Sequence, residues 1–143
     1  MILSMKLSTK VRYAVSAMCD LAFNYSPEKP VQIKDIAQRQ NLSVQYIEQL
    51  FNKLKRARLI RSIRGPRGGY ILAERPSKVR IGDIYRIVEG PIALVGCVDR
   101  GASRIACTMS AKCSTKPLWA KLSKMMEKVL DSTTLSDLCG GEK

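Results

Sequence analysis

The 143-residue sequence contains no histidine and few aromatic or acidic residues. Without histidine, the chain lacks the commonest general acid or base, histidine-ligated metal sites and histidine-activated nucleophiles. A Walker-type loop and a dinucleotide-binding glycine fingerprint are also absent, so we do not expect an enzyme. No apolar run approaches the ~20 residues of a membrane-spanning helix, and the N-terminal residues lack the pattern of a signal peptide. These absences predict a cytoplasmic protein with no membrane partner.

Positive charge is the strongest feature of what is present. Lys and Arg number 25 against 12 Asp and Glu, which gives a formal net charge of +13, and the hydrophobic fraction of 45% is that of a chain that folds. Residues 1–80 hold 16 basic and 5 acidic side chains, whereas residues 81–143 hold 9 and 7. A basic protein without a specific partner would distribute its charge evenly. The asymmetry predicts that the first half contacts a polyanion.

Three amphipathic segments predict helices at residues 8–24, at residues 33–39 and from Ser43 to about residue 57. Asn41 and Leu42 form the expected turn between the second and third helices. The apolar stripe assigned to the third helix is Val44, Ile47, Leu50, Phe51, Leu54 and Ala57; its opposite face carries Gln45, Gln49, Asn52 and Arg56. A short helix, a tight turn and a longer helix with an amide-rich outer face are typical of a helix-turn-helix. The same pattern also occurs in helical bundles that bind no nucleic acid.

Two short strands are predicted next, at residues 59–63 and 70–72, joined by the segment RGPRGG. Pro66 favours a turn, and Gly65, Gly68 and Gly69 are expected to supply left-handed backbone positions. Arg64 and Arg67 would extend from the tip of this hairpin. Residues 39–67 carry eight basic side chains and one acid. The sequence thus predicts a mainly α fold with a small β-hairpin wing, a winged helix-turn-helix whose third helix enters the major groove of DNA.

The second half contains two further predicted helices, at about 81–88 and about 116–132, separated by a cysteine-containing loop at about 92–115. In the long C-terminal helix, Leu118, Leu122, Met125 and Val129 recur in steps of four, three and four. This heptad seam predicts a dimerisation helix, although a helix that packs on its own domain is a competing interpretation. We expect residues 1–80 to form the DNA-binding domain and residues 81–143 to form the linker helix, the sensor loop and the dimerisation helix.

Three stretches of the chain resemble the IscR-type family of bacterial transcription regulators: KLSTKVRYAVSAM, SVQYIEQLFNKLKRARLIRSIRGPRGGYIL, and IGDIYRIVEG followed by a three-cysteine loop and LW. The resemblance extends from Met5 to about Leu138. It implies a winged-helix homodimer that binds a pseudo-palindromic operator in double-stranded DNA, and we expect a repressor. Together with the residue chemistry, it predicts a DNA-binding set of Ser43, Gln45, Tyr46, Glu48, Gln49, Lys53, Arg64, Gly65 and Arg67. Gln suits adenine, Arg suits guanine or a narrow minor groove, and Glu can accept from cytosine.

The cysteine loop of the family binds an iron–sulfur cluster in several members, and the resemblance implies Cys97, Cys107 and Cys113 as ligands, with [2Fe-2S] favoured. Lys116 stands where cluster-binding relatives of one subgroup have histidine. Arg12 stands where a nitric-oxide-sensing subgroup has aspartate. The fourth ligand therefore stays open, with Cys19, Cys139, Asp99, a hydroxyl or an exogenous group as candidates.

Alternatives to a cluster are a three-cysteine zinc site and thiols that sense oxidation directly. Basic neighbours, Arg104, Lys112 and Lys116, would favour the thiolate form. At the level of the whole protein, the competing hypotheses are a cluster-free regulator of the same fold with protein or small-molecule partners, and a protein that handles metal or redox equivalents. A winged domain that binds RNA or another protein is a further alternative.

Overall fold

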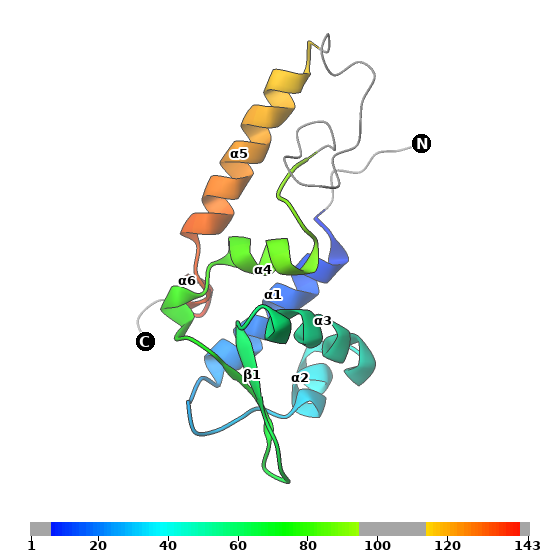
Figure 1. Ribbon diagram of the computed structural model, residues 1–143, viewed down its shortest axis with the longest axis vertical. Coiled ribbons are helices and arrows are strands. Elements are labelled where there is room, and N and C mark those ends of the chain that lie inside the picture. The colour runs from blue at the N-terminus through cyan, green and yellow to red at the C-terminus, as the bar shows by residue number, and fades with distance from the viewer. Residues whose placement is uncertain (1–6, 95–113, 141–143) are drawn as a thin grey trace.

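A computed structural model of the chain describes residues 7–94 and 114–140 (Figure 1). The elements are α1 (Thr9–Phe23), α2 (Ile33–Gln40), α3 (Val44–Arg56), β1 (Ile60–Ile63), β2 (Gly69–Leu72), the 3-10 turn η1 (Pro76–Lys78), α4 (Ile81–Val88), α5 (Lys116–Ser132) and α6 (Leu135–Leu138). This confirms the mainly helical fold with a two-stranded hairpin. The sequence did not predict η1 or α6. In the described residues, no helix has the length and apolarity needed to cross a membrane.

The core gathers around α1, which carries fully buried Ala14, Ala17 and Met18. Against it pack Ile47, Phe51 and Leu54 of α3 and Ile84 of α4, together with other apolar residues of α2, β1 and β2. Two apolar residues assigned to the buried stripe of the third helix lie outside this core, since Val44 and Ala57 are exposed. Both stand at a helix end, where the stripe no longer meets a neighbouring element. The hydrophobic pattern thus predicts which face of a helix is buried. It does not predict how far along the helix that face is covered by neighbouring elements.

The turn between α2 and α3 is built from two local polar contacts. Asn41 adopts a left-handed conformation (φ 54°), which is the backbone geometry that most often ends a helix and which Asn tolerates. The N–H of Leu42 then donates to the Ala37 carbonyl at 2.9 Å. Ser43 begins the next helix, because its Oγ accepts from the Tyr46 N–H at 3.1 Å. The predicted turn and helix cap are confirmed.

The hairpin is antiparallel, with Ile60 opposite Leu72 and Ile63 opposite Gly69. Its turn closes through the Gly68 N–H, which donates to the Gly65 carbonyl at 2.9 Å. Gly65 has a φ of +115° and Gly69 one of +157°, whereas Gly68 does not have a positive φ, so the expectation of three left-handed glycines is wrong for Gly68. A side chain at Gly68 would instead collide with the Ile63 carbonyl oxygen.

The end of the hairpin ladder nearest the turn is fastened to the loop before α2. Val31 and Tyr70 exchange two backbone hydrogen bonds of 2.9 and 2.8 Å. A Cβ atom at Gly69 would collide with the Val31 backbone, so glycine permits this approach. The Tyr70 ring also packs edge-on against Phe51 of α3, with ring centroids 5.0 Å apart. These contacts fix the hairpin relative to α3.

After α5 the chain returns to the winged domain. The Ile81 N–H donates to the Thr133 carbonyl and the Leu135 N–H donates to the Val79 carbonyl, both at 2.9 Å. The side chain of Leu135 is fully buried in the core. The lower end of α5 is thereby anchored, while α5 itself rises away from the hairpin toward the opposite end of the molecule (Figure 1).

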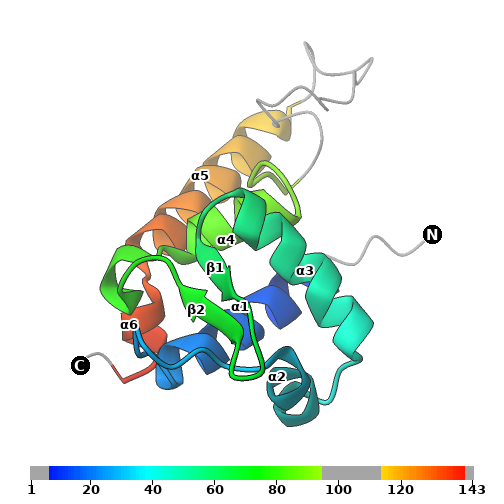
Figure 2. The same ribbon diagram turned by 60° about the horizontal axis from the view of Figure 1, so that its bottom comes forward.

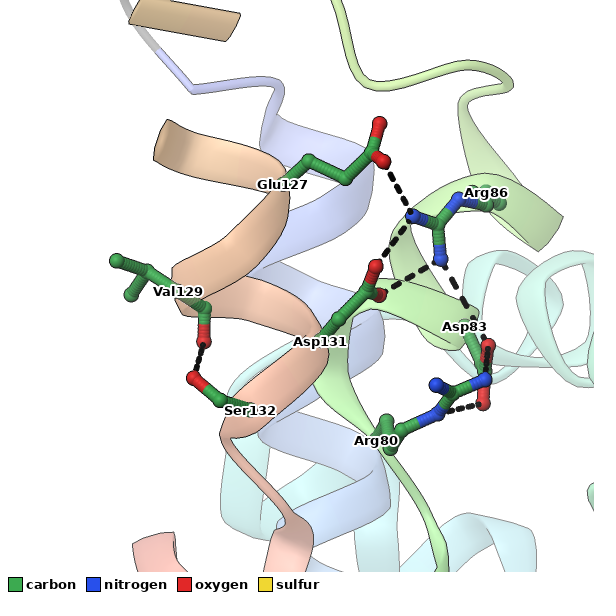
Figure 3. A network of polar contacts seen from close by, with 7 residues as sticks. All are labelled: Arg80, Asp83, Arg86, Glu127, Val129, Asp131 and Ser132. Carbon is green, nitrogen blue, oxygen red and sulfur yellow. Dashed lines mark hydrogen bonds and ion pairs between the residues drawn. The ribbon is translucent and has the colours of Figure 1, made fainter. Parts of the chain in front are cut away.

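A group of charged side chains joins α4 to α5 (Figure 3). Arg86 of α4 donates to both carboxylate oxygens of Asp131, each at 2.7 Å. Asp83 lies 3.8 Å from Arg86 and also accepts from Arg80. The Asp131 carboxylate rests against Gly82, where any Cβ would occupy its place. This network positions α5 on the domain core.

Candidate DNA-binding surface

The outer face of α3 lies beside the hairpin at one end of the molecule, and Figure 2 shows both in front of α1. Ile47, Leu50, Phe51 and Leu54 hold the inner face of α3 in the core. The outward face therefore presents Gln45, Gln49, Asn52 and Arg56 to solvent. Amide groups in this position can pair with base edges, because each offers a donor and an acceptor together.

All nine residues predicted to bind DNA are described, and all lie on α3, its cap or the hairpin turn. Eight of them are exposed. The exception is Tyr46, which is half-buried because its ring packs edge-on against Tyr13 of α1, with centroids 5.8 Å apart. Tyr46 thus also joins α3 to α1. The other eight are accessible to a ligand on α3, its cap and the hairpin turn.

Basic side chains on this surface are available to phosphates. In the described part of the chain, no salt bridge involves Lys53, Arg64 or Arg67. Arg39, which the sequence placed in the same basic group, is different. It donates to both carboxylate oxygens of buried Asp20, at 2.8 and 2.6 Å, and therefore ties α2 to α1. A pair formed by residues 19 positions apart leaves no periodic signal in the sequence.

Glu48 is the one acid on this surface, and it lies near Tyr70 of β2. Burial raises the pKa of Tyr70, and the nearby Glu48 carboxylate raises the pKa further. The carboxylate makes no ion pair within the described residues. It can thus accept a hydrogen bond from a cytosine amino group, and it would repel a phosphate at the same place.

The structure adds Val44 to the exposed surface at the start of α3. It was missed because it fits the spacing of the buried stripe. Its position next to the cap of a recognition helix is the available signal, since the first turn of such a helix approaches the bases. An apolar side chain there can contact the methyl group of thymine.

The candidate cluster ligands Cys97, Cys107 and Cys113, and the alternative ligand Asp99, lie outside the described residues. Among residues 7–94 and 114–140, no group of three metal-ligating side chains occurs. At the two positions where the sequence resemblance implied a fourth ligand, this chain has Arg12 in α1 and Lys116 in α5. Neither cation can ligate iron.

The arrangement of α2, the tight turn, α3 and the β1–β2 hairpin defines a winged helix-turn-helix protein. A family model agrees with this class. The model of the Rrf2 family, described as an iron-dependent transcriptional regulator, matches residues 7–141. The chain belongs to the Rrf2 family.

Individual relatives support the same assignment. The chain is 41% identical over 134 residues to the transcriptional regulator CymR of Bacillus subtilis (strain 168), which covers 94% of this chain and 89% of CymR. It is 37% identical over 139 residues to the transcriptional regulator IscR of Klebsiella pneumoniae (strain 342), which covers 97% and 82%. The solved structure of CymR, the global cysteine regulator of B. subtilis, has a TM-score of 0.79 and 38% identity, with 100% of both chains covered. The protein is accordingly a DNA-binding transcription regulator and not an enzyme.

Proposed function

We propose that this protein is a homodimeric repressor that binds a pseudo-palindromic operator through α3 and the hairpin. One observation carries the proposal. Exposed amide side chains gather at one end of the molecule with basic side chains that form no salt bridge within the described residues. In the proposed complex, Gln45, Glu48 and Gln49 contact base edges in the major groove. Arg64 and Arg67 enter the adjacent minor groove, and Lys53 contacts phosphate.

The proposed dimer forms through α5. Its heptad residues Leu118, Leu122, Met125 and Val129 are 51, 36, 56 and 62% exposed. Met126 and Leu130 on another side of α5 already pack against the core. The described residues thus leave the seam uncovered, which favours a second copy of α5 as its partner. Twofold symmetry then predicts two half-sites about one helical turn, ~34 Å, apart.

Leu122→Glu tests the dimer, because a charge in the seam would have to be buried unpaired on association. Sedimentation equilibrium is expected to show a dimer for the parent chain and a monomer for Leu122→Glu. Lys124→Glu is the matched control, since Lys124 is exposed on α5 away from the seam and its substitution should leave the dimer intact. A parent chain that sediments as a monomer would contradict the dimer.

The DNA contacts are tested on an operator selected from random duplexes with the full chain. Gln49→Ala and Arg64→Ala are each expected to weaken specific binding by roughly 1–3 kcal/mol and to relax selection at one position per half-site. Arg75→Ala is the control, because Arg75 is an exposed arginine that precedes η1, and η1 packs against α6. Equal binding by the parent chain and both site variants would contradict the assignment of α3 and the hairpin. Repression itself is tested by transcription in vitro from a promoter that overlaps the operator.

We further propose that operator affinity depends on the state of Cys97, Cys107 and Cys113, through either a [2Fe-2S] cluster or thiol oxidation. Three thiolates suit an iron–sulfur cluster, and the family description names iron dependence. With Arg12 and Lys116 at the relatives' ligand positions, a fourth ligand must be another group or an exogenous one. A bound cluster would supply a one-electron redox couple.

The protein is prepared anaerobically, and iron and acid-labile sulfide are counted per chain. These counts decide between a [2Fe-2S] cluster and thiol oxidation. One operator fragment is then titrated with the reduced apo, oxidised and cluster-loaded protein. Equal affinities in all three states would remove the sensing role. A cluster-free regulator is the second candidate, and the likeness to CymR, named a cysteine regulator, favours it. Iron-free protein that binds the operator fully would establish that candidate.

A further inference from the structure

Two cysteines outside the cysteine loop meet across the fold. Cys19 lies in α1 and Cys139 directly follows α6, 120 residues further along the chain. The Cys139 Sγ donates to the Cys19 carbonyl oxygen at 3.8 Å. The Cys139 thiol also lies close enough to Cys19 to raise the pKa of that thiol, after the larger effect of burial. Both are free, half-buried and packed against the hydrophobic core.

The contact is held in place from both sides. Cys19 follows the fully buried Met18 in α1, the central helix of the core. The Cys139 N–H donates to the Leu135 carbonyl at 3.0 Å, and Leu135 is itself fully buried. Cys139 stands next to the last described residue, and its backbone bond to Leu135 together with the packing of α6 on α1 holds it beside Cys19. Two thiols brought together this way can form a bond once their side chains rotate into disulfide geometry.

We propose that Cys19 and Cys139 form a reversible intramolecular disulfide, a redox-modification site that fastens the C-terminal segment to α1. Both cysteines lie outside the cysteine-containing loop in the sequence. Ser114, where the described chain resumes after that loop, lies at the other end of α5 from Cys139 (Figure 1). A helix of 17 residues spans about 25 Å. The inference does not rest on the proposed repressor function.

The bond can form by exchange with a low-molecular-weight disulfide such as glutathione disulfide. One protein thiolate attacks a glutathione sulfur, which gives a mixed disulfide and releases one glutathione thiolate. The second protein thiol loses its proton and attacks the mixed disulfide at the protein sulfur. It forms the Cys19–Cys139 bond and expels the second glutathione. The protein is oxidised by two electrons, and one glutathione disulfide is reduced to two thiols.

Burial controls how readily this happens. Desolvation, followed by the proximity of Cys139, raises the pKa of Cys19 to about 12, and burial also raises the pKa of Cys139. Few thiolates are present near neutral pH, so exchange is slow compared with that of an exposed cysteine. The disulfide is therefore expected to form when the surroundings stay oxidising for a long time. A short exposure to an oxidant should leave the two thiols reduced.

The structural effect of the bond is to join the C-terminal segment to the core helix α1. Cys139 follows the segment that anchors α5, and Cys19 belongs to the core helix. A link between residues so far apart in sequence restricts the unfolded chain strongly. Oxidation is therefore expected to raise the thermal midpoint by several degrees and to protect residues 133–139 from hydrogen exchange.

The full chain with Cys97, Cys107 and Cys113 changed to serine isolates the two thiols. It is equilibrated with excess glutathione disulfide at about pH 7 and about pH 9, where thiolate is more abundant. Free thiols are blocked with N-ethylmaleimide, and the digest is analysed by mass spectrometry. The expected product is one Cys19–Cys139 linked peptide pair, lost on reduction with dithiothreitol and accompanied by a raised thermal midpoint.

Two further variants add Cys19→Ser or Cys139→Ser to the same background. Each should give a single glutathione adduct, no link and no thermal shift on oxidation. The parent chain with all five cysteines should give the same linked pair, which controls for effects of the serine background. Alkylated thiols or separate glutathione adducts on both cysteines at about pH 9, with no linked peptides, would overturn the proposal.

Discussion

The ion pair between Arg86 and Asp131 gives the most direct test of how α5 is held. Its two hydrogen bonds, both 2.7 Å long, join side chains that are 35 and 27% exposed. Hydrogen bonds to charged groups contribute ~1.5–3 kcal/mol when buried, whereas exposed pairs contribute ~0.2–1 kcal/mol. The two side chains are neither fully buried nor fully exposed, so an intermediate contribution applies. Asp131→Asn is expected to lower the free energy of unfolding by about 1–2 kcal/mol. Asparagine keeps the shape and one acceptor but loses the charge.

Glu127→Gln provides the matched control on the same helix. Its carboxylate reaches the same Arg86 only at 3.9 Å and is 51% exposed. The same change from acid to amide there should alter stability by less than ~0.5 kcal/mol. Urea unfolding followed by helical circular dichroism at one protein concentration measures both variants, because the proposed dimer would make apparent stability depend on concentration.

The pH dependence of the same pair has a definite sign. The hydrogen bonds from Arg86 lower the pKa of Asp131 below its usual value. A lowered folded-state pKa contributes stability above the unfolded value of ~4, and this contribution disappears as the pH falls through the folded pKa. The parent chain and Asp131→Asn should thus differ fully at neutral pH and converge in acid. Equal stability at neutral pH, or an equal loss for Glu127→Gln, would refute the proposed role of the pair.

Three other substitutions or reactions test separate parts of the fold. Leu135→Ala removes the fully buried anchor after α5 and should cost ~2–5 kcal/mol in urea unfolding, whereas Leu138→Ala, at an exposed position of the same helix, should cost far less. Arg58 has a φ of +64°, so Arg58→Gly should stabilise the chain by about 1 kcal/mol; no gain in a thermal melt would contradict strain there. Iodoacetamide should alkylate Cys19 progressively faster as the pH is raised above neutral, with no plateau before about pH 10, because its pKa is raised to about 12. A plateau near pH 8 would show that the thiol is not desolvated.

The sequence predicted the fold where local chemistry decides it. Ser43 and Asn41 determine where the turn and α3 begin, and both act through backbone groups within a few residues. The repeat of Leu118, Leu122, Met125 and Val129 identified a distinct face of α5, and the structure leaves that face exposed. The partner that covers it stays a prediction.

Features that depend on contacts between distant segments were not predicted. Helix α6 has four residues, too few to show a period, and it is fixed by Leu135 in the core. Arg39 was placed with the DNA-binding cations because its partner Asp20 belongs to another helix. The meeting of Cys19 with Cys139 likewise follows only from the return of the chain after α5.

The backbone bridge between Val31 and Tyr70 affects the thermodynamics of association. It ties the loop before α2 to the hairpin, and Tyr70 in turn packs on Phe51 of α3, so the proposed docking on DNA should cost little conformational entropy there. Calorimetry on such a preorganised surface should show a heat-capacity change close to that of rigid-body docking, without the larger value that accompanies coupled folding. A change that breaks the two Val31–Tyr70 hydrogen bonds would leave the hairpin to become ordered only when it binds its target.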